Sequence, residues 1–163
     1  MRLHELQDFI VSRLLSNPVF AGLGMELNRG ILKEDGTYPK TAFLEESLEE
    51  FGLAIIVWEP ESLESSDDNS FGSCVYDVWV PVIIEENTKK NRGGDGTGLS
   101  WGQVVEEIQK VVVGANEEDA TPGSKPFRSA DKPWKNFGSQ DGVHRCAVNF
   151  VKRHVVKPHK PTP

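Results

Sequence analysis

His144 and Cys146 are the two residues of this 163-residue chain whose types and spacing come closest to a nucleophilic pair. They stand two positions apart in a strand-like stretch, so both side chains would point to one face. A reactive cysteine needs a lowered pKa, which a nearby cation or a helix N-terminus provides. Here Val148 and Phe150 continue the same face, and apolar surroundings raise the pKa of a thiol instead. This predicts an inert Cys146, and a thiolate pair with His144 stays open as an alternative.

The second cysteine, Cys74, also lies in a strand-like stretch. Two buried free thiols are the simplest interpretation for a chain with no sign of export. A disulfide between Cys74 and Cys146 would require neighbouring strands, and this alternative also stays open.

The remaining sequence patterns supply no catalytic or metal-binding chemistry. The histidines are dispersed along the chain, and the sequence contains no CxxC, HExxH or GxSxG. The GGDGTG at 93–98 lacks the GK[ST] ending of a phosphate-binding loop, so it predicts a flexible loop. Carboxylate pairs at 45–46 and 49–50 are typical of the solvated side of a helix. We therefore expect no catalytic residue, no cofactor, no metal and no enzyme activity.

Length and composition predict a single globular domain. Hydrophobic residues make up 37% of the chain and charged residues 26%. We place the domain at 1–156 and a disordered basic tail at 157–163. No stretch approaches the roughly 20 apolar residues of a membrane span, and the first residues have no signal-peptide pattern. The net charge of −7 argues against general nucleic-acid binding.

The element that must position most of the charged and aromatic side chains is a long strand at 72–87. Its side chains alternate over about twice the usual strand length. One face is apolar or aromatic, which predicts contact with a core. The other face carries Asp77, Trp79 and Glu85, which predicts contact with solvent or a partner. Pro81 cannot donate to a sheet ladder and predicts an edge position or a bulge.

Helices and further strands surround this element. Ser100 and Gln103 match a capping box, which predicts the start of an amphipathic helix that ends at Gly114. The other expected elements are helices at 3–16 and 41–51, strands at 53–59 and 143–156, and loops at 61–70, 85–99 and 115–142. The turn-rich stretch at 28–40 predicts an irregular segment or a short hairpin. This order predicts an α+β fold: a two-layer sandwich with a mixed or antiparallel sheet and helices packed on one face.

The order and character of these elements resemble the small tail-completion, or tail-terminator, proteins of tailed bacteriophages. Five segments carry the resemblance: LHELQDFIVSRLLSNPVF, LAIIVWEPE, SCVYDVWVPVIIEEN, SWGQVVEEIQKVVVG and VHRCAVNFVKRHVV. It spans nearly the whole chain, but the segment at 28–51 and the long loop at 115–142 depart from the family pattern. The resemblance implies a ring, expected to be a hexamer, in the virion tail or neck and, during assembly, in the host cytoplasm.

A ring of this family caps the tail tube, ends tube polymerisation and presents a surface for head joining. The implied partners are further copies, the tail tube protein and a head-completion or connector protein. DNA would pass through the lumen without specific binding, and no membrane is involved. Asp77 and Trp79 would meet basic residues of a neighbour, and the charged loop at 85–98 would become ordered on assembly. The expected interface residues are Asp77, Trp79, Glu85, Glu86, Lys89, Lys90, Arg92, Arg145 and Arg153.

Three alternative functions stay open at this point. The first is another head–tail connector or neck subunit. The second is a small intracellular protein-binding module that uses the open face of its sheet and stays monomeric. The third is a hydrolase that uses Cys146 or a carboxylate pair.

Overall fold

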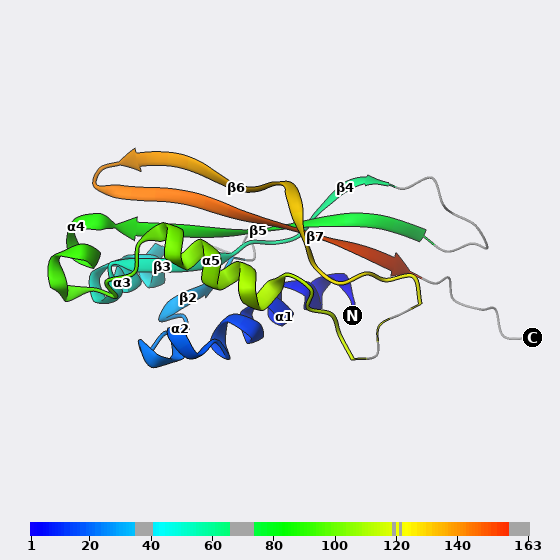
Figure 1. Cartoon of the computed structure of the whole chain (residues 1–163), viewed down its shortest axis with the longest axis horizontal. Helices are drawn as coiled ribbons and strands as arrows, with labels where there is room; N and C mark the ends of the chain where they lie inside the picture. The colour runs from blue at the N-terminus through cyan, green and yellow to red at the C-terminus, as the bar shows by residue number, and fades with distance from the viewer. Residues whose placement is uncertain (35–40, 66–73, 119, 121, 157–163) are drawn as a thin grey trace, which may run out of the picture.

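The computed structural model describes residues 1–34, 41–65, 74–118, 120 and 122–156. Its centre is a mixed seven-stranded sheet with the order β1-β2-β3-β5-β7-β6, and β4 pairs with β5 (Figure 1). The strands are β1 (Glu26–Leu27), β2 (Gly30–Lys33), β3 (Leu53–Val57), β4 (Glu61–Ser65), β5 (Cys74–Asn87), β6 (Arg128–Gln140) and β7 (Val143–Val156). The helices are α1 (Leu3–Leu15), α2 (Pro18–Gly22), α3 (Thr41–Phe51), α4 (Thr88–Lys90) and α5 (Trp101–Val112), with a further helical turn at Asn91–Asp95.

The sheet is parallel from β1 to β3 and antiparallel in its other pairs. The predicted α+β fold with helices on a mixed sheet is therefore confirmed. The predicted tail at 157–163, and the parts of predicted elements at 35–40, 66–70 and 72–73, lie outside the described residues.

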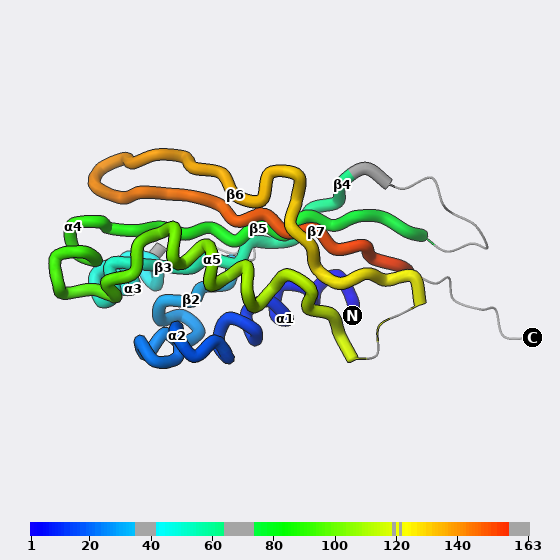
Figure 2. Tube along the Cα trace, in the orientation of Figure 1, coloured from blue at the N-terminus to red at the C-terminus, as the bar shows by residue number. Residues whose placement is uncertain are grey.

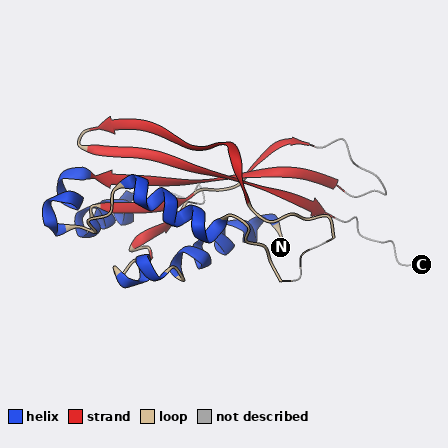
Figure 3. Ribbon diagram, viewed as in Figure 1, coloured by secondary structure: helices blue, strands red, loops and turns tan. Residues whose placement is uncertain are grey.

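The helices α1, α2 and α5 form a layer on one face of the sheet (Figure 3). Buried side chains of α1, α2 and α5 pack there against β5 and β7. The helix α3 is the exception, because Leu44 and Leu48 pack against Leu32, Ala54 and Ile56 on the opposite face. On that opposite face, no helix of the described residues covers the area formed by β5, β7 and β6. We call this area the open face.

The strand β5 alternates as predicted, with Val78 and Ile84 among the fully buried core residues. The predicted edge position is wrong, because β7 lies on one side of β5 and β3 followed by β4 on the other. The alternative, a bulge at Pro81, is wrong too, because the register of β5 with β7 is unbroken there. The Pro81 carbonyl accepts a hydrogen bond from the Trp58 backbone N–H at 3.1 Å. Because the N and O of a strand residue point to one side, the missing N–H of Pro81 faces the link between β3 and β4. The only bond lost is the reciprocal one to the Trp58 carbonyl, and the ladder with β7 keeps all its donors.

The prediction of a structureless loop at 115–142 is wrong in its second half. Residues of β6 pair with β7 through a two-residue turn, Asp141-Gly142, whose φ angles are +52° and +78°. Two positive φ angles are typical of a type I′ hairpin. The trace of β6 bends sharply early in the strand (Figure 2), where the register shifts between Ser129 and Trp134. Likewise, the start of the loop predicted at 61–70 is strand β4.

The best-signalled helix of the sequence, α5, begins as predicted. The Gln103 N–H donates to Ser100 Oγ at 3.3 Å, and the Ser100 N–H donates to Gln103 Oε1 at 2.8 Å. The capping box is thus confirmed. No helix in the described part of the chain is long and apolar enough to cross a membrane.

Candidate assembly interface

The open face gathers five of the residues predicted at an interface. The register of β5 with β7 places Asp77 opposite Arg153 and Glu85 opposite Arg145. Trp79 lies between them on the same face, since its position differs by two from Asp77. Alternation along each strand, together with the pairing of β5 with β7, therefore brings these side chains to one surface.

The carboxylates of Asp77 and Glu85 form ion pairs with arginines of the same chain. Asp77 accepts from Arg153 Nε at 3.3 Å and from Arg128 Nη2 at 3.2 Å. Arg145 donates to Glu85 through Nε at 2.7 Å and also through Nη2. These pairs form in cis because residues directly opposite in an antiparallel ladder have adjacent side chains.

Trp79 is also held inside the chain. Its indole N–H donates to Asn149 Oδ1 at 3.0 Å, and the Asn149 amide donates to the Lys132 carbonyl at 3.1 Å. Lys132 lies where the pairing of β6 with β7 is interrupted, between Ser129 and Trp134. The hydrogen bonds of Trp79 and Asn149 therefore fix the position of this unpaired part of β6. A shallow depression of about 360 Å³ lies at this point, lined by residues of β5, β6 and β7 and by Leu63 of β4.

A second depression on the open face, of about 520 Å³, is lined by exposed aromatic residues. Trp58 is 41% exposed and Phe137 is 52% exposed. Ile83 and Val143 add aliphatic surface between them, and the Glu85–Arg145 pair lies along one side. We call Trp58, Ile83, Phe137 and Val143 the aromatic patch. The alternation of side chains along the strands does not mark these four residues as a group.

A bulge in β6 presents Phe137 to this patch. The pairing of β6 with β7 shifts between Asn136 and Gly138, and Gly138 has a φ of +81°. The Gly138 N–H donates to Asn136 Oδ1 at 2.7 Å. A bulge with glycine in the left-handed region re-aims the neighbouring side chain. The ammonium of Lys135 lies 5.2 Å from the Phe137 ring centroid, which is a cation–π contact.

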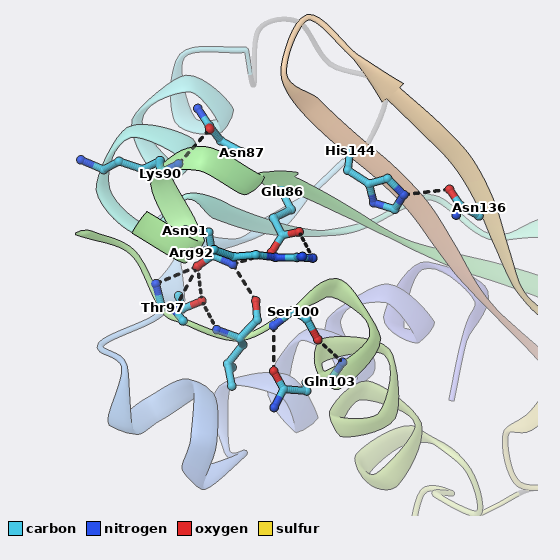
Figure 4. A network of polar contacts seen from close by, with 12 residues as sticks. Glu86, Asn87, Lys90, Asn91, Arg92, Thr97, Ser100, Gln103, Asn136 and His144 are labelled. Carbon is cyan, nitrogen blue, oxygen red and sulfur yellow. Dashed lines mark hydrogen bonds and ion pairs between the residues drawn. The ribbon is translucent and has the colours of Figure 1, made fainter. Parts of the chain in front are cut away.

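The predicted flexible loop at 85–99 is an ordered structure centred on Asn91 (Figure 4). The Asn91 amide donates to Glu86 Oε2 and to the Leu99 carbonyl, both at 2.6 Å. Its carbonyl accepts from the Thr97 N–H at 2.8 Å and from the Gly98 N–H at 3.2 Å. Asn91 is fully buried. The prediction that this loop becomes ordered only on assembly is therefore wrong.

Glycine is required at two positions around Asn91. A Cβ at Gly52 would lie 2.6 Å from the Asn91 backbone nitrogen, and one at Gly96 would lie 2.5 Å from the Asn91 Cα. The chain can close on Asn91 from both sides only because these residues lack a side chain.

The other four predicted interface residues belong to this region rather than to the open face. Glu86 is fully buried and binds Arg92 Nη2 at 3.1 Å. Lys89 is exposed and Lys90 is half-buried, both in α4. The predicted interface residues thus lie in two separate places, the open face and the loop centred on Asn91.

Cys146, the potential nucleophile, lies in surroundings that disfavour its reactive thiolate form. Burial raises its pKa to about 12, and the nearby Glu86 carboxylate acts in the same direction. The predicted raised thiol pKa is confirmed. Cys146 and Cys74 are both free. Cys146 lies opposite Ile84 and Cys74 lies opposite Val156, so the two thiols are far apart along the paired strands β5 and β7. The predicted burial of Cys74 is wrong, because Cys74 is exposed.

We expect the two thiols to differ in reactivity by orders of magnitude. In the native protein, a thiol reagent should modify Cys74 rapidly and Cys146 only after unfolding, because Cys146 is buried and its thiolate is disfavoured. Labelling with and without denaturant, followed by mass spectrometry, measures this. Fast native labelling of Cys146 would revive the hydrolase hypothesis.

His144 lies on the same face as Cys146, but it is used for packing. Its Nε2 lies 2.8 Å from Asn136 Oδ1, and its ring centroid lies 5.2 Å from that of Trp101. Trp101 also contacts Trp134 of β6, with centroids 5.7 Å apart. These contacts hold the hairpin of β6 and β7 against α5.

A buried lysine ties the segment before β6 to β7. The Lys152 ammonium donates to Asn116 Oδ1 and Ser124 Oγ at 2.9 Å and to the Lys125 carbonyl at 2.7 Å. Its side chain is fully buried, and burial lowers its pKa. The oxygen atoms of this segment therefore replace the water that the ammonium loses.

Next to this lysine, His154 gives the protein a predicted pH response. Burial lowers the pKa of His154 below 6.5, and nearby positive charges, Lys152 among them, add to this. The unfolded chain then binds the proton more readily, so stability falls as pH drops from about 6.5 towards the folded pKa. We expect His154→Gln to reduce this slope, in thermal melts between about pH 7.5 and pH 5. The exposed His4→Gln is the control, and an unchanged slope in His154→Gln would contradict the expectation.

Within the described residues, no group of three His, Cys, Asp or Glu side chains is placed to hold a metal ion. Comparison with models of protein families finds no match for the chain. Comparison with curated proteins finds none either.

Proposed function

We propose that the chain is a structural subunit of a bacteriophage tail. It would form a ring on the end of the tail tube, stop tube polymerisation and present the surface to which the head joins. The observation that carries this proposal is the aromatic patch on the open face of the sheet. The order of the elements along the chain supports the same function through the resemblance to tail terminators.

The aromatic patch has the character of a protein–protein contact. Half-exposed Trp58 and Phe137 border a hollow with aliphatic residues beside them. Aromatic side chains in such positions provide much of the binding free energy at interfaces. The ion pairs of Asp77 and Glu85 would then shape the surface, because their charges are already satisfied within the chain.

A small protein-binding module is the second candidate, because the same patch could receive a peptide or a different protein. A head–tail connector is the third. A terminator must bind one end of the tube and stop its growth. A connector would bind the tube without stopping its elongation. A protein-binding module of another pathway would not bind the tube.

The test is to add the purified protein to growing tail tubes and to image them by negative-stain electron microscopy. We expect one decorated end per tube and arrested elongation. Phe137→Asp should weaken end binding roughly 10- to 30-fold, because it places a carboxylate in the aromatic patch. Leu3→Asp changes an exposed apolar residue of α1 in the helix layer and is the matched control. Decoration along the whole tube, or no binding at all, would exclude a terminator.

A further inference from the structure

The open face carries cations that the chain does not neutralise. The arginines of β6 and β7 on this face pair with Asp77 or Glu85. Lys132 and Lys135 of β6 are exposed, and neither has an ion pair within the described residues. Asp131 and Asp141 line the two depressions as well, so in the described part of the chain this face carries three arginines and two lysines against four carboxylates, Asp77, Glu85, Asp131 and Asp141. In a chain with a net charge of −7, the open face is thus slightly positive, and its Lys135 contacts Phe137 of the aromatic patch.

The helix α3 offers the opposite charge. Glu45, Glu46 and Glu49 are exposed, and among the residues that the structure describes none of them forms an ion pair. Glu50 differs, because it binds Arg29. Phe43 on the same helix is 38% exposed. The outer side of α3 therefore combines three carboxylates with an exposed aromatic ring.

We infer that α3 of a second copy docks on the open face. Its carboxylates lie near Lys132 and Lys135, and Phe43 contacts the aromatic patch. Opposite charges orient such a contact, and the aromatic surface that becomes buried stabilises it. This inference rests on the proposed self-association and names the two surfaces involved.

The contact joins two different surfaces of the same chain. A head-to-tail contact of this kind closes into a ring when its rotation allows it. If the α3 helix of each of two copies docks on the open face of the other, the same contact gives a two-fold dimer. The stoichiometry therefore tests the ring, and the charges test the contact.

Charge reversal on each surface tests the contact. We expect Glu46→Lys with Glu49→Lys to weaken self-association roughly tenfold at low salt, measured by sedimentation equilibrium. Lys132→Glu with Lys135→Glu should weaken it similarly, because either change opposes like charges. The combined four-residue variant should associate nearly as well as the natural chain, since both signs are exchanged. Glu106→Lys with Glu118→Lys makes the same charge change at exposed positions outside both surfaces and is the control.

Circular dichroism shows that each variant is folded before its association is compared. The inference is overturned if either double variant associates normally, if the combined variant is not rescued, or if the control weakens association equally. A natural chain that stays monomeric at every concentration also overturns it. That result leaves the proposed function to the tube experiment, in which the tube itself is present. A rescued dimer would support the contact and count against the ring.

Discussion

Replacing Asn91 with alanine is expected to lower the free energy of unfolding by roughly 3 kcal/mol or more. The buried amide donates to the Glu86 carboxylate, which is itself fully buried. Without Asn91, Arg92 is the remaining partner of Glu86 in the described part of the chain. The Thr97 hydroxyl loses its acceptor in the same substitution. The N–H groups of Thr97 and Gly98 each lose one of two acceptors and keep the backbone carbonyls of Phe51 and Asn91. Chemical denaturation followed by circular dichroism measures the effect.

Asn87→Ala is the matched control for Asn91→Ala. Asn87 caps α4 through one hydrogen bond, in which its Oδ1 accepts from the Lys90 N–H at 3.1 Å. Loss of such a cap costs about 1 kcal/mol. If Asn91→Ala costs no more than this control, Asn91 does not organise the loop.

Replacing Lys152 with methionine is expected to lower the free energy of unfolding by roughly 2–3 kcal/mol. Methionine retains much of the apolar stem, but the oxygen atoms of Asn116, Ser124 and Lys125 lose their shared donor. We also expect faster hydrogen exchange at the backbone amides of Gly114 and Phe127. These amides bond across the base of the segment, to the carbonyls of Phe127 and Ala115 respectively.

Lys110→Met is the control for this second substitution. Lys110 is largely exposed on α5 and pairs with Glu107, so its loss should change the free energy of unfolding far less than the loss of Lys152 does. Buried charges can sometimes be replaced by apolar groups without loss of stability. An equally stable Lys152→Met protein would show that this is such a case.

The elements that sequence predicts correctly are those with a local pattern. The alternation along β5 and the capping box of Ser100 and Gln103 involve residues a few positions apart, and the structure confirms both. The strand β6 lacks such a pattern because it is mostly exposed, contains Pro133 and shifts its register twice. Its hairpin signal was nevertheless present in Asp141-Gly142.

The candidate site depends on contacts that are distant in the sequence. Asp77 and Arg153 become partners only once the neighbour and register of β5 are known. Trp58 and Phe137 come from a strand end and a bulge, so alternation does not mark them. Asn91 stands in a glycine-rich stretch whose closure depends on the Phe51 carbonyl, which accepts from the Thr97 N–H at 3.0 Å.

The pairing of β5 with β7 also sets the order in which the chain folds. Partners in this ribbon are 56 to 82 residues apart, whereas the hairpin of β6 and β7 closes over the two residues of its turn. Closing a short loop costs less entropy, so we expect the hairpin to form before β5 pairs with it. The open face would then acquire its final arrangement only when β5 joins the hairpin. If a neighbouring copy binds this surface, as proposed, it can do so only after that step, so the proposed ring would form after folding rather than alongside it.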